Sequence, residues 1–178
     1  MMEARVEIVE GTFRSLRARA PGLTCEVARQ FGERFHCVRD ADVEFFPGAL
    51  ETLDELRSRG VRLALITNGQ AEAQRGKIEK FDLARRFEHI QIEGELGFGK
   101  PDERAYRHAL TALNVSPAQC WIVGDNLEWE VAAPQRIGIY AVWLDSRRVG
   151  LPAGSTVRPD RTVRLISELL EPSLAQIP

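Results

Sequence analysis

A short apolar run that ends in Gly-Asp and continues into a helix constrains the fold of this chain most strongly. The run Cys-Trp-Ile-Val at 120–123 has no polar alternation, which is typical of a parallel strand covered on both faces. Gly124 permits a tight turn, and Asp125 falls at the carboxyl end of the strand, where open α/β sheets bind their ligands. Asn126 and Glu128 are favourable as the cap and the first-turn anion of a following helix.

Two carboxylates, Asp125 and Glu130, are about one helical turn apart beside this turn. Oxygen ligands of this kind can hold a hard cation such as Mg²⁺. A capped helix whose acidic side chains are solvated explains the same ten residues equally simply. The stretch alone therefore leaves a metal site and an ordinary helix start as alternatives.

Length and composition limit the classes of protein that this chain can represent. With 178 residues and 44% hydrophobic content, it can bury one domain-sized core with a small appendage. The net charge of −2 argues against a nucleic-acid surface, and Arg14, Arg17 and Arg19 are interpreted as a solvated helix face. No apolar run has membrane-spanning length and no signal-peptide segment is present, so we expect no membrane partner.

The cysteines and histidines give no pattern of metal ligands. Three cysteines, Cys25, Cys37 and Cys120, are odd in number and widely spaced in apolar surroundings. This pattern indicates buried thiols in a reducing compartment and predicts a cytoplasmic protein.

The first part of the chain has the periodicity of two helices. Apolar residues recur at helical spacing over 3–19, and the sequence then reaches Pro21. Thr24 has the type and position of the cap of a second helix, and the pair reads as a helical hairpin. A third helix is predicted to begin at Pro47 and to stop at Gly60.

After Gly60 the pattern changes to strands that alternate with helices. The predicted strands are 61–66, 89–92, 120–123 and 139–144, the helices are 71–80, 101–113, 127–137 and 163–170, and the loops are 93–99 and 145–158. Such alternation predicts an α/β fold, a Rossmann-like doubly wound parallel sheet. All carboxyl ends of its strands should face one edge.

Three polar signals are predicted to meet at this edge. They are Thr67 and Asn68 after one strand, Lys100 after the glycine loop, and Asp125 with Glu130 after another strand. Each alone is explained by a turn residue, a surface charge or a solvated acid. Together, a hydroxyl with backbone amides, an ammonium and metal-binding carboxylates are what a phosphoryl group requires.

These motifs resemble those of the haloacid dehalogenase-like (HAD) hydrolase superfamily, in its capped small-molecule phosphatase branch. The segments that carry the resemblance are Leu-Ile-Thr-Asn-Gly at 65–69, Gly-Phe-Gly-Lys-Pro-Asp at 97–102, Val-Gly-Asp-Asn at 123–126 with Glu130, Phe-Pro-Gly-Ala-Leu-Glu-Thr-Leu at 46–53, and Gln74, Lys77 and Phe81. The resemblance covers residues 45–166. It implies an α/β core over 45–178 and a partial helical cap over 1–44.

The resemblance also implies a role for each site residue. Thr67 would hydrogen-bond the phosphoryl group, and Asn68 and Gly69 would complete the phosphate site. Lys100 would stabilise the nucleophile and the developing negative charge. Mg²⁺ would be coordinated by the set Asp125, Asn126 and Glu130. The family usually has Asp where this chain has Glu130, so this acid is expected either to support the metal site or to accept from Lys100.

The first motif of the family, Asp-x-Asp-x-Thr, has no counterpart in a strand context before Phe46. The segments 40–44 and 6–12 imitate it, but the first follows a helix and the second has Ile8 where the nucleophile belongs. An apolar side chain cannot attack phosphorus, so we expect this chain to have little or no turnover.

The absent motif also implies an absent central strand, between the strands that end at Thr67 and Asp125. Unpaired backbone groups there would cost on the order of 1–3 kcal/mol each. The neighbours could close on each other, residues 5–9 could insert, another chain could donate a strand, or the natural protein could start upstream of Met1. We expect the last, and an in-frame Asp-x-Asp-x-Thr in the upstream DNA would support it.

The sequence therefore predicts a Mg²⁺-dependent phosphohydrolase of a small phosphorylated metabolite, inactive as this chain. The alternatives are a non-catalytic derivative that binds a phosphorylated ligand or a protein, and a haloacid dehalogenase that would use the same absent Asp without metal. An open central strand position makes a homo-oligomer or strand exchange more plausible than usual.

Overall fold

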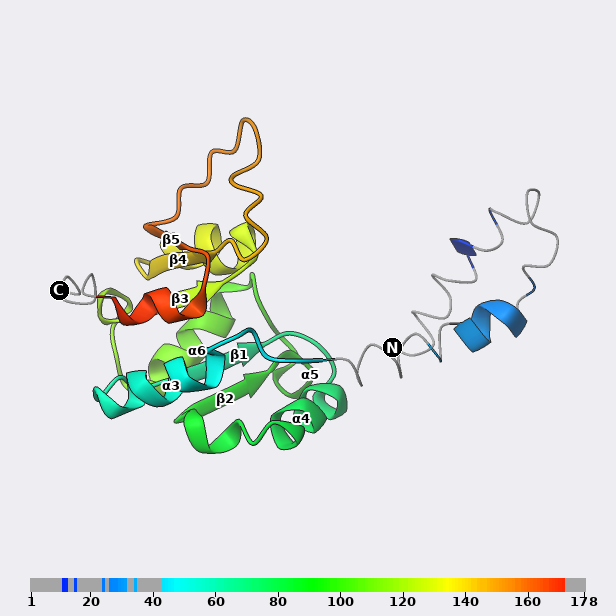
Figure 1. The fold of residues 1–178 in the computed structure, drawn as a ribbon, viewed down its shortest axis with the longest axis horizontal. Coiled ribbons are helices and arrows are strands. Elements are labelled where there is room, and N and C mark those ends of the chain that lie inside the picture. Colours follow the sequence, from blue (N-terminus) through cyan, green and yellow to red (C-terminus); the bar gives the residue numbers. More distant parts are fainter. Residues whose placement is uncertain are drawn as a thin grey trace. The chain divides into compact units, whose positions relative to one another are not determined.

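The computed structural model describes residues 11–12, 15, 24, 26–31, 34 and 43–171. Contacts divide the chain into two units, Met1–Glu44 and Phe45–Pro178 (Figure 1). The candidate site lies in the second unit.

Two stretches of helix are described in the first unit. Residues 11, 12 and 15 are helical, and the rest of the predicted helix 3–19 lies outside the described residues. A second helix includes residues 26–31 and 34. The hydroxyl of Thr24 accepts from the amide of Val27 at 3.2 Å, so the prediction that Thr24 caps this helix is confirmed. The assignment of this unit as a partial cap stays a prediction, and Cys25 and Cys37 lie outside the described residues.

The second unit alternates strands with helices, as the sequence predicts. In chain order its elements are α3 (Ala49–Ser58), β1 (Ala64–Thr67), α4 (Ala71–Lys80), the 3₁₀ helix η1 (Ala84–Arg86), β2 (His89–Ile92), α5 (Glu93–Leu96), α6 (Glu103–Leu113), the 3₁₀ helix η2 (Pro117–Gln119), β3 (Trp121–Gly124), the π-helix η3 (Leu127–Ala132), α7 (Ala133–Gln135), β4 (Tyr140–Leu144), β5 (Arg161–Val163) and the 3₁₀ helix η4 (Ile166–Leu170).

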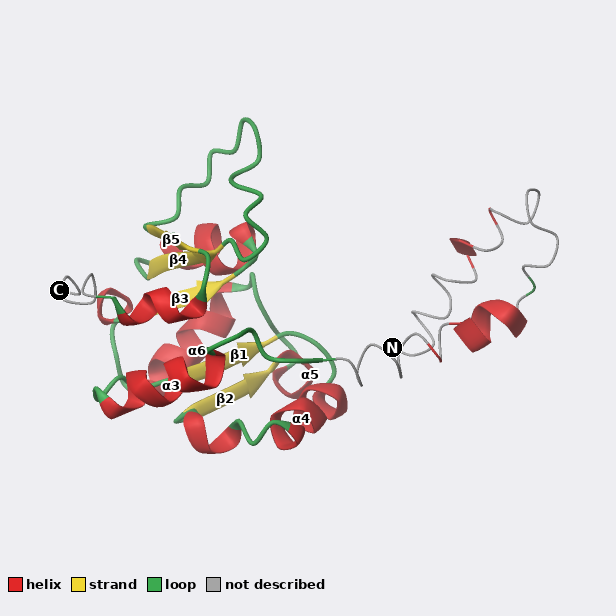
Figure 2. Ribbon diagram, viewed as in Figure 1, coloured by secondary structure: helices red, strands yellow, loops and turns green. Residues whose placement is uncertain are grey.

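Every strand pair of this unit is parallel, so the predicted α/β fold is confirmed. In one ladder β1 pairs with β2, with Ala64 opposite His89 and Thr67 opposite Ile92. In a second ladder β4 lies between β3 and β5. Figure 2 shows helices on both sides of these strands, which is the layered arrangement of a doubly wound sheet.

The two ladders are not joined. No described strand lies between β1 and β3, and no backbone ladder connects them. Both strands are only half-buried along their length, whereas four of the five residues of β4 are buried. One predicted alternative was that the strands on either side of the absent central strand close on each other, and the described residues do not show this pairing. Another was the insertion of residues 5–9, which lie outside the described residues.

Side chains from both ladders share the same helical cover. Ile66 of β1 and Ile122 of β3 both pack against a core cluster that includes Tyr106 and Leu110 of α6. On the opposite face of β3, Trp121 and Val123 pack with buried residues of β4, β5 and η4. The alternation along β3 is the two-residue period of a strand. Helix α6 thus spans the junction between the two ladders on one face.

The structure corrects several predicted boundaries near β1. The strand predicted over 61–66 begins at Ala64, because the amide of Val61 closes the end of α3 on the Leu56 carbonyl. The ladder with β2 can begin only after this closure. Pro47 lies in the turn before α3, whose first residue is Ala49.

Three other predictions were wrong in detail. The loop predicted over 93–99 starts with the one-turn helix α5. The predicted helix 127–137 is a π-helix followed by the short α7. The predicted helix 163–170 is replaced by β5 and η4, because buried Val163 packs on β4 while its carbonyl accepts from the amide of Asp145.

Candidate active site

Thr67 and Asn68 lie at the carboxyl end of β1. The Thr67 hydroxyl lies 3.1 Å from the side-chain oxygen of Gln74, to which it donates. The Asn68 side chain makes two hydrogen bonds to one residue: its amide donates to the Lys100 carbonyl at 2.6 Å, and its oxygen accepts from the Lys100 amide at 2.9 Å. The structure therefore brings together two predicted site segments that are 32 residues apart in the sequence.

Lys100 connects this pair to the other ladder. Its ammonium donates to a carboxylate oxygen of Glu130 at 2.7 Å, and the two side chains are only 13% and 6% exposed. The second carboxylate oxygen of Glu130 accepts from the Asn126 amide at 2.9 Å. A continuous chain of hydrogen bonds thus runs from Asn68 through Lys100 to Glu130 and Asn126. Charged pairs that are this buried are strong when every partner is satisfied.

Gly124 makes room for Glu130. A Cβ atom at Gly124 would lie 2.1 Å from Cγ of Glu130 and 2.6 Å from its Cδ. Atoms do not approach this closely, so only glycine can end β3 with the Glu130 side chain folded over it. The Gly-Asp pair therefore does more than permit a turn, because it also positions the buried acid.

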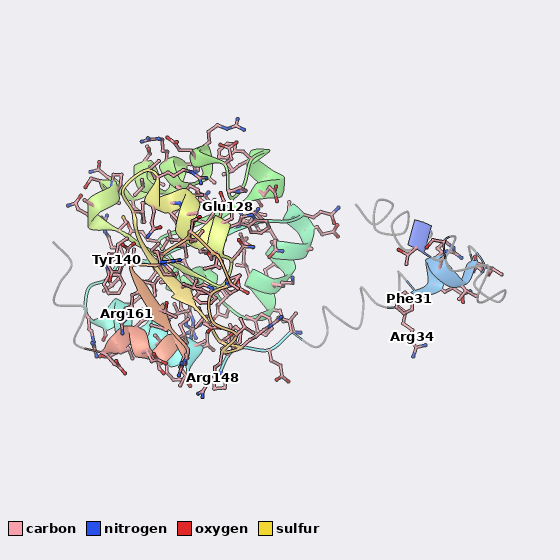
Figure 3. The ribbon with its side chains drawn as sticks, turned by 90° about the horizontal axis from the view of Figure 1, so that it is seen from above. Phe31, Arg34, Glu128, Tyr140, Arg148 and Arg161 are labelled. Atoms are coloured by element: carbon pink, nitrogen blue, oxygen red, sulfur yellow. The ribbon has the colours of Figure 1, made fainter. Side chains whose placement is uncertain are left out.

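The π-helix after β3 presents its acidic residues in two directions. Asn126 caps it, since its side-chain oxygen accepts from the amides of Glu128 and Trp129, both at 3.0 Å. Glu128, which is labelled in Figure 3, has a half-exposed side chain that pairs with Arg136 at 3.0 Å. Glu130 turns inward to Lys100 instead. Wide helical turns of this kind are frequently found at functional sites.

Asp125 is exposed at the carboxyl end of β3. Its backbone carbonyl accepts from the indole of Trp143 at 3.0 Å, which fixes the main chain. Among the residues that the structure describes, none hydrogen-bonds or pairs with its carboxylate. The side chain is thus available to a ligand, in contrast to Glu130.

The type of ligand atom at this site suits a magnesium ion, although few protein ligands are available. Within the described residues, no group of three or more His, Cys, Asp or Glu side chains gathers in a way that could hold a metal. Mg²⁺ commonly binds through one or two carboxylates and keeps several waters. One free carboxylate, Asp125, meets that minimal demand, while Glu130 has both oxygens engaged by Lys100 and Asn126.

The phosphate-site prediction did not include Glu93. Its carboxylate accepts from the amide of Gly69 at 2.9 Å, which is the amide that the prediction assigns to phosphate. The amide of Gly94 in turn donates to the carbonyl of Gly69 at 3.0 Å. The sequence contains no local signal for this contact, because it joins residues 24 positions apart. Gln74, by contrast, was part of the family match and here holds the Thr67 hydroxyl.

Burial changes the titration of two groups behind the site. Burial, with a smaller effect of the Glu130 charge, raises the pKa of the Tyr106 phenol, whose hydroxyl donates to the Trp129 carbonyl at 2.6 Å. Burial also raises the pKa of the half-buried, unbonded Cys120 thiol. Both groups are therefore neutral near pH 7. Cys120 was predicted to be a buried thiol and is half-buried here. No described helix is long and apolar enough to cross a membrane.

The fold and these motifs define a member of the haloacid dehalogenase-like hydrolases. A sequence model of that family matches residues 1–138, and the chain belongs to the family. Its relatives include a phosphoserine phosphatase from Thermus thermophilus, which is 40% identical over 136 residues, or 76% of this chain and 54% of the relative. An N-acylneuraminate-9-phosphatase from Rattus norvegicus is 37% identical over 70% of this chain and 49% of its own length.

The structural comparisons agree with this assignment. A 2-haloacid dehalogenase from Pseudomonas syringae has a TM-score of 0.68 at 26% identity, covering 98% of this chain and 71% of its own. A HAD phosphatase from Thermococcus onnurineus has the same TM-score at 21% identity, covering 99% of this chain and 93% of its own, which shows the shared fold. The predicted family and its phosphatase branch are confirmed, and the chain spans about half the length of the curated relatives it matches.

Proposed function

We propose that this chain carries the site of a Mg²⁺-dependent phosphohydrolase that acts on a small phosphorylated metabolite. The hydrogen-bonded chain from Asn68 through Lys100 to Glu130 supports this proposal most directly. It holds the ends of β1 and β3 together, so the hydroxyl of Thr67, the ammonium of Lys100 and the carboxylate of Asp125 belong to one edge. The phosphatase relatives support the same reaction class.

Each residue has a defined task in this proposal. Thr67 orients a phosphoryl oxygen, and Asn68 fixes the loop that presents Lys100. Lys100, held by Glu130, offsets the negative charge of the phosphoryl group. The Gly69 amide joins the phosphate site if the ligand displaces the carboxylate of Glu93 from it.

Asp125 is the proposed metal ligand, with Asn126 and Glu130 behind it. A bound Mg²⁺ would polarise the phosphoryl oxygen and neutralise part of its charge. Asp125 is suited to this position because its carboxylate is exposed and unpaired among the described residues. Glu130 is better suited to hold Lys100, since both of its oxygens are already engaged.

The covalent step is proposed to be absent from this chain. The unjoined ladders leave no described strand beside β1 and β3 to carry an attacking aspartate between Thr67 and Asp125. We therefore expect the 1–178 chain to bind phosphate and Mg²⁺ but to turn over slowly or not at all. The alternative is a non-catalytic protein that binds a phosphorylated ligand or a protein partner, and binding without turnover would also agree with that alternative.

The test combines binding with turnover in the purified 1–178 chain. We expect isothermal titration to detect Mg²⁺ binding that Asp125→Asn weakens at least tenfold and that Glu128→Gln, on the same helix start, leaves unchanged. Equal binding by both variants would contradict the metal assignment. Rapid, Mg²⁺-dependent hydrolysis of p-nitrophenyl phosphate that Asp125→Ala abolishes would contradict the absence of a nucleophile.

A dehalogenase is the second candidate, favoured by the 26% identity to a 2-haloacid dehalogenase. Chloride release from 2-chloropropionate without Mg²⁺ would support it over the phosphatase.

The chain is also proposed to form a homo-oligomer or to exchange a strand between copies. Sedimentation of the same sample tests this proposal, and a clean monomer with cooperative unfolding would contradict it. A cytoplasmic location is proposed from the cysteine pattern.

A further inference from the structure

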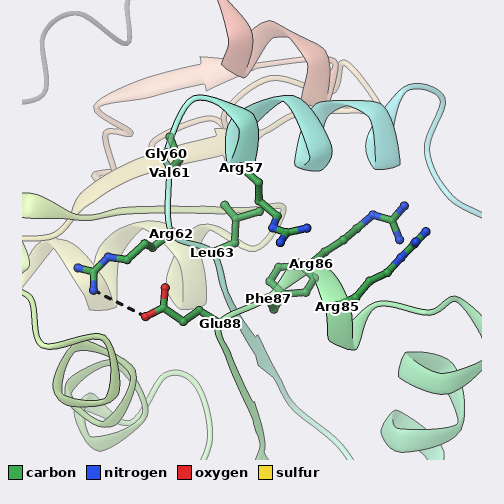
Figure 4. A pocket seen from close by; sticks show the side chains of 9 residues that line it. All are labelled: Arg57, Gly60, Val61, Arg62, Leu63, Arg85, Arg86, Phe87 and Glu88. Atoms are coloured by element: carbon green, nitrogen blue, oxygen red, sulfur yellow. Dashed lines mark ion pairs between the residues drawn. The ribbon is translucent and has the colours of Figure 1, made fainter.

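A pocket lies at the opposite end of β1 and β2 from the candidate active site. Its walls are the end of α3, the loop that leads into β1, and the segment between η1 and β2 (Figure 4). Its volume is about 440 Å³, and it shares Arg57 and Arg85 with a neighbouring pocket of about 480 Å³. These volumes fall within the range of small-molecule sites, roughly 300–1,000 Å³.

Four arginines line this pocket: Arg57, Arg62, Arg85 and Arg86. Arg86 is the fixed point among them, because its side chain is only 6% exposed and binds both carboxylate oxygens of Asp54, at 2.9 and 3.0 Å. It also donates to the Asp82 carbonyl at 3.1 Å. The hydrogen bond from Arg86 holds the pKa of Asp54 below its usual range. Partial burial opposes this effect, and the charges of Arg86, Arg85 and Arg57 add to it. Arg86 is therefore held in place before any ligand arrives.

Two other arginines have acidic partners at the surface. Arg85 pairs with Asp82 at 2.7 Å, and both side chains are about two-thirds exposed, at 64% and 66%. Arg62 donates to the Leu113 carbonyl at 2.7 Å and lies 3.8 Å from Glu88, directed away from the other guanidinium groups (Figure 4). Pairs this exposed are weak and exchange easily with solvent or a ligand.

Arg57 is the uncompensated charge of the set. It belongs to the last turn of α3, and its guanidinium makes no hydrogen bond or ion pair with another residue in the described part of the chain. Its charge acts on Asp54 only as one of the smaller electrostatic effects. Its guanidinium extends toward Leu63 and Arg86, on the side where Arg85 also lies (Figure 4). Arg86, Arg85 and Arg62 are each paired with an acid. The positive charge of Arg57 is left without an acidic partner of its own, beside the guanidinium groups of Arg85 and Arg86. Like charges this close attract an anion.

Apolar side chains complete the pocket wall. Leu63 and Phe87 are half-buried and line it together with exposed Val61. An inorganic ion would leave this apolar surface uncovered, whereas a ligand with an apolar body would bury it at a gain of roughly 25 cal/mol per Å². Guanidinium groups form bidentate hydrogen bonds with phosphate and carboxylate groups, and a cluster of them favours phosphate because it carries more negative charge.

We propose that this pocket is a second ligand site, which binds a small molecule carrying a doubly charged phosphate group on an apolar body. Arg57 and Arg85 hold the phosphate beside the fixed Arg86, and the body lies against Leu63 and Phe87. The site is independent of the proposed active site, because it lies at the amino-terminal end of the strand that Thr67 ends.

Phenylphosphonate is a suitable probe, because its carbon–phosphorus bond resists hydrolysis at the active site. At mildly alkaline pH, where phosphonates are doubly charged, ¹⁵N-resolved titration should give saturable shifts at the amides of Gly60, Val61 and Glu88. Methylphosphonate should bind more weakly, since it lacks the apolar body. Absence of saturable shifts at these three amides would refute the site, and equal affinity for both phosphonates would refute the role of the apolar wall.

Matched variants separate this site from a general charge effect. We expect Arg57→Gln to weaken phenylphosphonate binding about tenfold or more, and Arg57→Gln with Arg85→Gln to abolish it. Arg147→Gln removes an exposed arginine from the loop after β4 and should leave binding unchanged, as should Thr67→Val at the active site. A similar loss in Arg57→Gln and Arg147→Gln would overturn the proposal, and loss in Thr67→Val alone would place the phosphonate at the active site instead. Urea unfolding of each variant verifies that the fold is intact.

Discussion

Replacing one member of the Lys100–Glu130 pair should destabilise the protein more than replacing both. Lys100→Met leaves the Glu130 carboxylate, 6% exposed, with the Asn126 amide as its remaining partner. Glu130→Gln leaves an ammonium that is 13% exposed without its counter-ion. Breaking a buried pair in this way costs about 3–5 kcal/mol, a large part of a typical stability of about 5–15 kcal/mol. For a domain of this size, the melting temperature should fall by roughly 6–20 °C.

The double variant gives the sharper result, because it contains no buried charge. Lys100→Met with Glu130→Gln keeps a side-chain oxygen for the Asn126 amide and removes both desolvated ions. We therefore expect it to be more stable than either single variant, although less stable than the parent. Urea unfolding followed by circular dichroism measures all four free energies without screening the charges. A double variant that is less stable than both single variants would refute this reasoning.

A surface pair provides the control for this cycle. Arg75 and Glu95 approach to 2.6 Å, as close as the buried pair, but their side chains are 46% and 32% exposed. Water screens such a pair, so Arg75→Met and Glu95→Gln should have no clear effect and no coupling. Equal effects at the two pairs would show that distance, and not burial, determines the loss.

Three further predictions follow from single contacts. Gly124→Ala places a methyl group where the Glu130 side chain lies, and unfolding experiments should show a loss of about 1–3 kcal/mol or more. Tyr106→Phe removes a buried 2.6 Å hydrogen bond, so the free energy of unfolding of this variant should fall by about 0.5–1.5 kcal/mol. In the parent protein, the absorbance change of the Tyr106 phenol, identified by its loss in Tyr106→Phe, should occur only above about pH 10. Arg86 lowers the pKa of Asp54 in the folded state below the ordinary value of 3.8. The ionised Asp54 carboxylate therefore stabilises the folded state above pH 3.8, and this stabilisation is lost as the pH falls through the lowered pKa. Asp54→Asn should therefore flatten the decline in stability below about pH 4, and an unchanged slope in acid unfolding would contradict the role of this pair.

Local patterns predicted the elements that depend on local signals. The polar helix at 71–80 and the short strand at 89–92 were predicted with their observed bounds, because turn and loop residues flank both of them. Strand β5 was missed because its three residues follow a long loop and are held by contacts with β4. The π-helix was missed because a wider turn has no distinct sequence signal and here accompanies the inward rotation of Glu130.

The candidate site follows the same division. Parallel strands meet at one edge, so Thr67, Lys100 and Asp125 could be grouped from the sequence alone. The contacts that join them could not, because Glu130 could equally have served as a metal ligand or as the acceptor for Lys100. Glu93 was missed for a related reason, since a glutamate in a glycine-rich loop gives no indication of which distant amide it binds. The arginine pocket joins segments that were assigned as a helix end and a turn.

The separate ladders also have a consequence for how the protein opens. Ladders that share no hydrogen bond can exchange their amide protons in separate cooperative events, so β1–β2 and β3–β5 are expected to behave as two local unfolding units. Asn68 and Lys100 belong to the first half of the site and Glu130 to the second, so their bonds link the two units. A ligand that engages both Thr67 and Asp125 binds only when both units are closed. Occupancy of the site would then couple their opening and give one exchange event where the free protein gives two.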